Sequence, residues 1–528
     1  MTENPKFPQY AILKITQKRK QFIVSNGANN KLIPTEEEFF EFLKQTASQV
    51  VELSANIPLS LEIFGNLTKF KYHADNVTTG DLKKIADAVP YLEELDVSAY
   101  EFETDANLCV KSETIEQLLR FVKLKSLRLD MHDFGHRINF KDFHKVVTQL
   151  PVEMLDLSFS ILLEAGDNVE EIKERNTYLP LSKLSINSTE NHCQTFKLLN
   201  TFKNLQKLNI SFVGEEQVTE DELKEFFQCF ENVTHLKMSY TKFKEIHNFA
   251  VPPNVTTLHL SYCDGLTFEN LQQLLEETPQ LIEFESEGMS YNIGEDQVLK
   301  ISPLIESLSI ENVDKNLLRV STTNKPTALR NVKLHLINPY KSIFSRPHIS
   351  AGPTPAKPLT LDHLLQFKNL KKFSFAVNLP DQWSYVIGAL QQLPLLCELT
   401  VRVMGAHRGT TASLLPQAFA TNITQLNVYY HCTPEWCLNF WLDMFTQNPE
   451  MNLNMNIFLH NEAMLQNFIE LEKFPQNLKT VMISGFNVDC AQLRNNFEET
   501  LKTFKYNFEE FEVDDLDRLD YNIVLSRK

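Results

Sequence analysis

A short apolar phrase returns throughout this chain and sets what it can fold into. In its clearest copy, residues 255–284 read VTTLHLSYCDGLTFENLQQLLEETPQLIEF, and Val255, Leu258 and Leu260 follow the pattern L-x-x-L-x-L. The last positions of this phrase alternate, which places their side chains on one side of a short β-strand. The stretch therefore begins with a strand that is buried on one face.

The rest of the same stretch predicts a turn, a helix and a return. Gly265 marks the turn, Thr267 is a good helix N-cap, and Pro279 stops the helix. Leu281 and Phe284 then begin the next strand. The residues with helical spacing are Phe268, Leu271, Leu274 and Leu275.

The strand phrase recurs from end to end, mostly at intervals of about 22–32 residues, which is the signature of a repeat protein. The copies, by first residue, are LTKFKY (67), LEELDV (92), LKSLRL (124), VEMLDL (152), LSKLSI (181), LQKLNI (205), VTHLKM (233), VTTLHL (255), LIEFES (281), IESLSI (305), LRNVKL (329), LKKFSF (370), LCELTV (396), ITQLNV (423), NLNMNIFL (452), LKTVMI (478) and FEEFEV (508). Several begin with an N-x-[ST] triplet, which we interpret as part of the repeat.

The chain resembles leucine-rich repeat proteins over roughly residues 50–515. Its stretch LSYCDGLTFENLQQLLEETPQL is similar to the cysteine-containing repeats of F-box-type leucine-rich proteins, although no F-box sequence is found. One repeat cannot bury its leucines alone, so repeats must stack. Strands lie about 4.8 Å apart and helices are about 10 Å wide, so the stack must curve. The resemblance implies an α/β solenoid, a horseshoe with a parallel β-sheet on its concave face and helices on its convex face.

Three segments are expected along the chain. Residues 1–49 predict an N-terminal cap of a β-hairpin and a helix, with Thr35 and Glu38 as a capping box. Residues 50–513 form an array of about 17 strands, interrupted by a proline-rich loop at 336–360. Residues 514–528 form a C-terminal cap.

Composition excludes several classes of function. A formal net charge of −17 disfavours nucleic acids and anionic membranes as partners. The chain has 14 glycines and no glycine-rich phosphate-binding motif. Its 8 cysteines are scattered singly, and no signal peptide or long apolar run occurs. These features indicate a reducing compartment, the cytoplasm or the nucleus.

Two stretches contain residues that could bind a metal or act in catalysis, but neither matches a complete motif. DMHDFGH (130–136) offers histidines and aspartates in a loop, but no kinase motif accompanies its DFG. HCTPEWC (431–437) has a cysteine spacing that does not match a zinc knuckle. No catalytic motif is recognised, so we expect no metal, no cofactor and no enzyme activity.

The informative residues are those expected between the buried leucines, on the inner face. Three glutamates occupy alternate positions of one strand, where their like charges face the same way. Aromatic, histidine and lysine side chains occur one or two repeats earlier, and aromatics beside charge are typical of binding surfaces. The predicted partner-binding residues are His235, Lys237, Tyr240, His259, Tyr262, Glu283, Glu285 and Glu287. Further charged residues expected on this face are Lys69, Lys71, Glu94, Asp96, Arg128, Asp130 and Asp156.

The sequence thus predicts a non-catalytic scaffold that binds a protein partner on its concave face. Resemblance to F-box leucine-rich proteins implies a first alternative, a substrate-recognition subunit of a cullin-type ubiquitin ligase that docks a ligase adaptor. A second alternative is a GTPase regulator of the leucine-rich GTPase-activating class, which would use an arginine such as Arg128 or Arg402.

Overall fold

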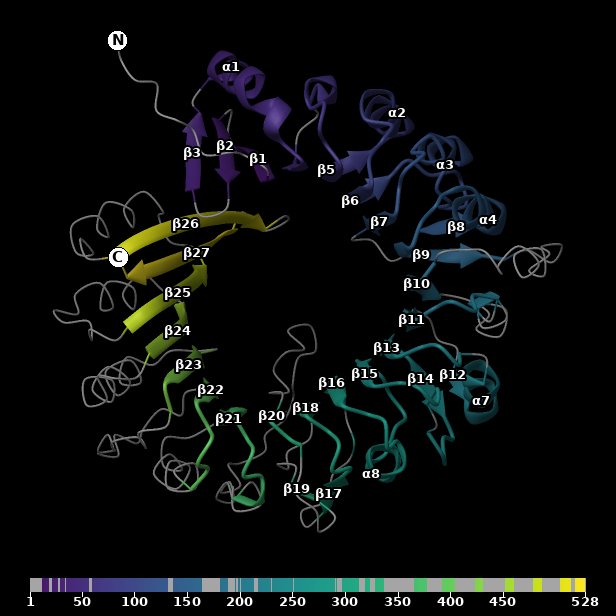
Figure 1. The fold of residues 1–528 in the computed structure, drawn as a ribbon, viewed down its shortest axis with the longest axis vertical. Coiled ribbons are helices and arrows are strands. Elements are labelled where there is room, and N and C mark those ends of the chain that lie inside the picture. Colours follow the sequence, from purple (N-terminus) through teal and green to yellow (C-terminus); the bar gives the residue numbers. More distant parts are fainter. Residues whose placement is uncertain are drawn as a thin grey trace. The chain divides into compact units, whose positions relative to one another are not determined.

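The computed structural model separates into two compact units, Met1–Gly265 and Leu266–Lys528. Figure 1 labels their helices and strands. Each unit contains its own ladder of parallel strands. The structure describes residues 12–18, 21–26, 29–33, 35–56, 59–131, 136–163, 181–188, 195, 198–199, 201–212, 217–228, 230–249, 251–289, 291, 297–312, 319–322, 328–336, 365–377, 392–403, 423–430, 452–459, 478–486, 504–513 and 518–527.

In the first unit, each strand phrase pairs in parallel with the next. Leu155, Leu184 and Leu208 stand side by side in register, and none of them is exposed. Alternate residues such as Asn209 lie on the other face of the sheet and reach solvent. The strands of this ladder, in spatial order, are β4 (Glu52–Ala55), β5 (Lys69–Val77), β6 (Glu94–Phe102), β7 (Ser126–Met131), β9 (Met154–Leu162), β10 (Lys183–Ser188), β11 (Lys207–Phe212), β13 (His235–Ser239) and β15 (Thr257–Ser261).

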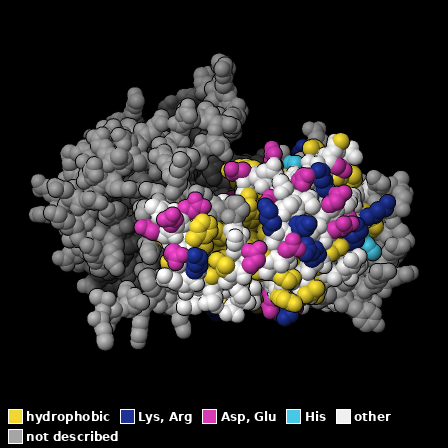
Figure 2. All heavy atoms as spheres, turned by 90° about the horizontal axis from the view of Figure 1, so that it is seen from above, with side chains coloured by type: hydrophobic (Ala, Val, Ile, Leu, Met, Phe, Trp, Pro, Cys, Tyr) yellow, Lys and Arg dark blue, Asp and Glu magenta, His cyan; other side chains and the backbone are white. Residues whose placement is uncertain are grey.

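Helices cover the outer side of this curved ladder, while the strands line its inner side (Figure 1). Figure 2 looks onto the helical side of the first unit, where acidic and basic side chains are intermixed. The helices are α1 (Glu36–Thr46), α2 (Thr79–Ala88), α3 (Ser112–Leu118), α4 (Phe140–Gln149) and α7 (Glu220–Phe227), with α8 (Phe268–Glu277) in the second unit. Two short 3-10 helices are η1 (Ala47–Gln49) and η2 (Leu61–Ile63).

Threonine begins several of these helices. Thr78, Thr219 and Thr267 each accept a backbone hydrogen bond in the first turn, and the side chain at the third helical position accepts one from the backbone N–H of the threonine. Such reciprocal capping satisfies two backbone donors that the helix itself cannot pair. The prediction that Thr267 caps a helix is therefore confirmed.

One backbone carbonyl just before each strand ties neighbouring repeats together. The carbonyl of Glu153, for example, accepts hydrogen bonds from the N–H groups of Ser182 and Lys183, the second and third residues of the next repeat phrase. The same contact recurs at Val51, Thr68, Glu93, Lys125, Ser182, Gln206 and Thr234 in the first unit, and at Ile282, Glu306, Arg330, Lys371 and Cys397 in the second. We call it the shared-carbonyl contact.

The N-x-[ST] triplets reinforce this contact. The side-chain amide of Asn232 donates to the carbonyl of Lys203, and the hydroxyl of Thr234 donates to that of Gln206. Asn254 and Thr256 repeat the arrangement one repeat later. These triplets are thus structural parts of the repeat, as the sequence indicated.

The N-terminal segment is antiparallel, unlike the rest of the first unit. The strand β1 (Ile12–Lys18) pairs with β2 (Gln21–Asn26), which pairs with β3 (Asn29–Ile33). β1 also lies parallel to β4, so this segment covers the first edge of the ladder. Thr35 caps α1, accepting from the N–H of Glu38, which is one of the two hydrogen bonds of the predicted capping box.

The second unit continues with the same pairing. Phe284 and Leu308 stand in register and are at most 1% exposed. The parallel strands are β16 (Glu283–Met289), β18 (Ser307–Asn312), β20 (Asn331–Leu336), β21 (Lys372–Val377), β22 (Glu398–Val403), β23 (Gln425–Tyr430), β24 (Asn452–Leu459) and β25 (Leu478–Phe486).

The last predicted repeat strand requires a correction. FEEFEV (508) lies in β26 (Phe504–Val513), which pairs antiparallel with β27 (Arg518–Arg527). It is β27, in antiparallel orientation, that lies next to β25. The phrase correctly indicates a strand but not its direction, because alternation of apolar residues is common to parallel and antiparallel strands.

Short strands outside the repeat phrases were not predicted. They are β8 (Arg137–Asn139) beside β9, the pair β12 (Gln217–Thr219) and β14 (Lys242–Lys244), and the pair β17 (Val298–Ile301) and β19 (Arg319–Thr322), all parallel. The predicted 336–360 loop lies almost wholly outside the described residues, as does HCTPEWC.

The fold is therefore an α/β solenoid of the leucine-rich repeat type, with parallel strands on one side and helices on the other, which confirms the predicted class. The division into a cap at 1–49, an array at 50–513 and a cap at 514–528 stays a prediction. None of the helices in the described part of the chain is long and apolar enough to cross a bilayer.

Candidate protein-interaction face

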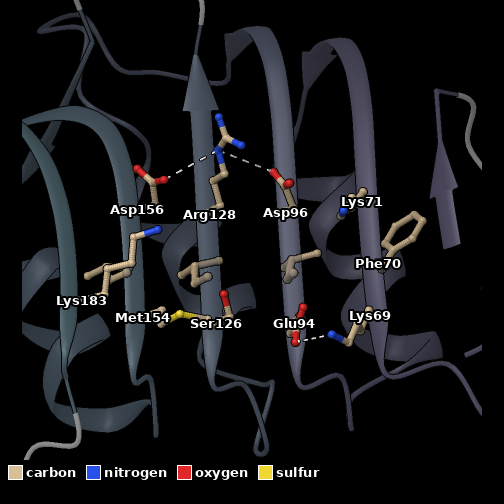
Figure 3. A pocket seen from close by; sticks show the side chains of 13 residues that line it. Lys69, Phe70, Lys71, Glu94, Asp96, Ser126, Arg128, Met154, Asp156 and Lys183 are labelled. Carbon is tan, nitrogen blue, oxygen red and sulfur yellow. Dashed lines mark ion pairs between the residues drawn. The ribbon is translucent and has the colours of Figure 1, made fainter. Parts of the chain in front are cut away.

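The inner face of the first unit consists of the side chains that alternate with the buried leucines. The register places them in rows across the strands: Lys69 beside Glu94, and Lys71 beside Asp96 and then Arg128. Figure 3 looks onto this face and shows Lys69 and Lys71 on β5, Glu94 and Asp96 on β6, Arg128 on β7 and Asp156 on β9. The alternation that buries Leu95 and Leu127 thus also brings these charges together.

Most charges at this end of the ladder are paired with one another. Lys69 Nζ lies 2.6 Å from Glu94 Oε1, and Lys71 Nζ lies 3.4 Å from Glu52 Oε1. These side chains are 26% to 44% exposed, so each pair contributes little to stability but fixes where its charges stand. We call the group Glu52, Lys69, Lys71, Glu94, Asp96, Arg128, Asp130 and Asp156 the charged cluster.

Arg128 is the centre of the charged cluster. Its Nη2 donates to Asp130 Oδ2 at 2.7 Å, and its Nε lies 4.0 Å from Asp96 Oδ1 and 3.8 Å from Asp156 Oδ2 (Figure 3). The three carboxylates come from three adjacent strands, β6, β7 and β9. A guanidinium between them offsets the repulsion that they would otherwise exert on each other.

Partial burial perturbs two titratable groups here. Desolvation by burial raises the pKa of Asp96, and the positive charge of Arg128 opposes that rise. Burial likewise lowers the pKa of His73, against the attraction of Asp96. The pKa of Lys69 is raised, chiefly by its hydrogen bond to Glu94. The face is therefore dense in fixed charges that are neither fully hydrated nor enclosed.

The charged cluster surrounds a hollow of about 180 Å³ in the inner face. Its floor is the leucine row, and its walls are the charged side chains of β5 to β10. The hollow is smaller than a typical small-molecule site and opens broadly to solvent. Its shape favours contact with a protruding part of another macromolecule. The lining residues are Lys69, Phe70, Lys71, Glu94, Leu95, Asp96, Ser126, Leu127, Arg128, Met154, Leu155, Asp156 and Lys183.

Toward β15 the charged side chains on the inner face are no longer mixed in sign. The predicted residues His235, Lys237 and His259 lie here, on β13 and β15, and all are partly exposed. Lys237 and His259 are partners in register. Two lysines that were not predicted join them, Lys183 on β10 and Lys207 on β11. We call these five residues the basic stretch.

The predicted tyrosines Tyr240 and Tyr262 form one feature. They follow the last residues of β13 and β15, are 46% and 43% exposed, and stack with ring centroids 5.5 Å apart and planes 8° from parallel. Both residues have positive φ, 54° and 51°, a left-handed conformation that is unusual for a bulky side chain. The backbone N–H of Tyr240 donates to the carbonyl of Ser261, which helps to hold this geometry. We call the two residues the tyrosine pair.

The remaining predicted residues, the three glutamates, belong to the second unit. Glu283 is exposed and Glu285 partly exposed on β16, and Glu285 Oε1 lies 4.0 Å from Nζ of Lys333 on β20. Between Ser286 and Met289 the register shifts by a bulge that contains Glu287. The regular alternation expected through Glu287 is therefore interrupted, while the binding role of all eight predicted residues stays a prediction.

The residues that the structure describes contain no candidate metal site. Across those ranges, no group of three or more histidine, cysteine, aspartate or glutamate side chains could hold an ion. His132 and Asp133 of the DMHDFGH stretch lie outside them, whereas His136 is buried and Asp130 contacts Arg128.

Comparison with known proteins adds a distant structural likeness. No family model matches the chain, and no curated protein matches it. A solved structure of a leucine-rich repeat protein from Leptospira interrogans aligns with 13% identity and a TM-score of 0.33, over 78% of this chain and 91% of that one. At this level the likeness bears on neither partner nor activity, and the fold assignment rests on the strand ladder itself.

Proposed function

We propose that the chain is a non-catalytic scaffold that binds a protein partner on the inner face of its strand ladders. The observation that carries the proposal is the density of fixed, partly exposed charges on that face, held on regular strands around an open hollow. Surfaces that bind proteins combine such preset polar groups with exposed aromatics. The tyrosine pair supplies the aromatics.

A reducing compartment, the cytoplasm or the nucleus, fits this proposal. None of the described cysteines Cys109, Cys263 and Cys397 is in a disulfide bond, and the first two are buried. Burial raises the pKa of Cys263, which keeps that thiol protonated and unreactive.

The two alternatives receive less support from the described residues. An F-box has three helices, whereas the described residues before β4 form three antiparallel strands, α1 and η1. Arg128 is surrounded by three carboxylates, which does not favour a role on a GTPase-bound nucleotide. The side chain of Arg402 lies outside the described residues. Co-purification of a cullin adaptor, or acceleration of GTP turnover by the chain, would revive the respective alternative.

The test is to map where a captured partner touches the chain. Partners are captured with the full chain from cells that contain it, and hydrogen exchange of the complex is compared with that of the free chain. We expect slowed exchange at inner-face strands. Slowed exchange confined to the helical side would refute the proposal.

A charge-reversal pair of variants makes the test specific to one face. Glu283, Glu285 and Glu287 are changed to lysine in one variant. The control changes Glu269, Glu276 and Glu277, three exposed glutamates of α8 in the same unit, so that the change in net charge is equal. The proposed role of the glutamates requires that the inner-face variant alone loses partner; equal binding by both variants would remove these residues from the site.

A further inference from the structure

The basic stretch stands out because the inner-face positions of its strands carry lysines and histidines and no carboxylate. From β10 to β15 the described inner-face positions hold Lys183, Lys207, Lys237, His235 and His259. The other positions there are serine, threonine or asparagine, and none is acidic: Ser185, Asn187, Asn209, Ser211, Ser239, Thr257 and Ser261. This is a cationic region within a chain of net charge −17.

The contrast with the neighbouring charged cluster shows that this imbalance is local. There, each of the cations Lys69, Lys71 and Arg128 has a carboxylate within 4.0 Å. Among the described residues, no ion pair within that distance involves Lys207 or Lys237. Lys183 stands at the border, near Asp156 in the hollow (Figure 3). Two ammonium groups therefore face solvent with their charge available to a ligand.

The spacing of these lysines suits an extended chain. Lys207 pairs in register with His235, so Lys237 lies one strand and two residues further on. With strands about 4.8 Å apart and a rise of about 3.4 Å per residue, the two Cα atoms are about 8 Å apart. Carboxylates at alternate residues of an extended segment are about 7 Å apart. Such a segment can bring two of them to the two lysines together.

The tyrosine pair borders this region. Each tyrosine follows directly on a strand that contributes to the basic stretch, β13 or β15. A left-handed conformation costs a non-glycine residue about 1–2 kcal/mol, and glycine or asparagine would adopt it more readily. Two neighbouring repeats nevertheless place an exposed tyrosine there, and the two rings stack. The two side chains are 46% and 43% exposed, and this exposed part offers apolar surface to an aromatic or proline residue.

We propose that the basic stretch and the tyrosine pair are the docking site for an extended acidic segment of the partner protein, with carboxylates at alternate positions and an aromatic or proline residue after them. The inference rests on the proposed function and specifies the chemistry of the partner. Nucleic acid is the less favoured polyanion, because the basic stretch has few cations and contains no arginine.

The experiment uses the full chain and a fluorescein-labelled peptide of about ten residues, with glutamate at alternate positions and a terminal tyrosine; fluorescence anisotropy measures binding. One variant carries Lys207→Glu and Lys237→Glu. Its control carries Lys83→Glu and Lys84→Glu on the exposed side of α2, an equal change in charge. We expect the first variant to weaken binding at least about tenfold and the control less than about twofold.

A second variant separates binding from stability. Replacing Tyr240 and Tyr262 by glycine removes both rings and relieves the left-handed strain. We expect the chain to stay folded by circular dichroism and to lose affinity for the peptide, but to bind a peptide that lacks the terminal tyrosine as the wild type does. A merely structural role of the tyrosines would predict no difference between the two peptides.

Three outcomes would overturn the inference. The first is that the Lys207/Lys237 variant binds the peptide as tightly as its control does, or that the wild-type chain binds a peptide with glutamine in place of glutamate as tightly as the glutamate peptide. The second is tighter binding of a single-stranded oligothymidylate through the same lysines, which would identify a nucleic-acid site. The third is a dimer in light scattering that the Lys207/Lys237 variant abolishes, which would identify a second copy as the occupant.

The proposed function can stand when this inference fails. A captured partner that slows exchange at other inner-face strands but not at β11, β13 and β15 would refute the acidic-segment site alone. Absence of slowed exchange at any inner-face strand would refute both.

Discussion

The leucines of the strand phrase can be tested at Leu208 in the middle of the first ladder. Leu208 on β11 is fully buried, in register with Leu184 on one side and Leu236 on the other. Leu208→Ala removes three carbon groups, a transfer free energy of about 2.4 kcal/mol. The two flanking leucines are fixed by their own strands, so we expect the cavity to collapse only in part. A total loss of about 3–4 kcal/mol in the free energy of unfolding follows.

The assay must report on the first unit, because a chain with two compact units need not unfold in one step. Hydrogen exchange of the backbone amides of β10, β11 and β13 gives that local free energy. The matched control is Asn209→Ala, the next residue along β11, whose side chain lies on the inner face. We expect a change within about 0.5 kcal/mol for the control. If the two substitutions cost the same, the leucine row is not the core of this solenoid.

Two further predictions concern a turn and a carboxylate. Gly265 has a φ of +88°, and a Cβ there would lie 2.2 Å from the carbonyl oxygen of Phe243. We therefore expect Gly265→Ala to lower the free energy of unfolding, measured in urea, by at least about 2 kcal/mol. The control Gly65→Ala, with open space around its Cβ, should change it by less than about 1 kcal/mol, and similar costs for the two variants would contradict the turn geometry. The pKa of Glu103 is lowered to about 2, first by its hydrogen bond from Lys111 and then by those from Thr79. Since this value lies below the ordinary 4.5, the stabilisation is complete above about pH 4.5 and is lost as the pH falls toward 2. The stability difference between wild type and Glu103→Gln should shrink over that window, and a carboxyl NMR titration midpoint near 4.5 would refute the contact.

Much of the fold could be predicted from the sequence because burial on one face of a strand leaves a direct mark on residue order. Leu258 and Leu260 had to alternate with solvent-facing residues, and the N-cap Thr267 had to precede its helix. The direction of β26 left no such mark, and three-residue strands such as β12 are too short to show a period.

The candidate site was predictable in its residues but not in its contacts. Arg128, Asp96 and Asp156 hold the same place in their phrases, so the repeat predicts that they stand in one row across three strands, whereas the side-chain distances between them depend on rotamers that residue order does not encode. Lys183 and Lys207 occupy the same place in their phrases as Lys69 does, so the basic stretch could have been recognised by comparing charges across repeats. The left-handed backbone conformation of Tyr240 could not be predicted from the sequence, since tyrosine rarely adopts that conformation.

The shared-carbonyl contact has a direction that bears on how the chain is made. In each instance, such as Glu153 with Ser182 and Lys183, the later repeat donates and the earlier repeat accepts. A ribosome releases the earlier repeat first, so its acceptor can already be in place when the donors emerge. Each folded repeat can then serve as the template for the next one, and folding can proceed during translation instead of starting only when the whole polypeptide is complete.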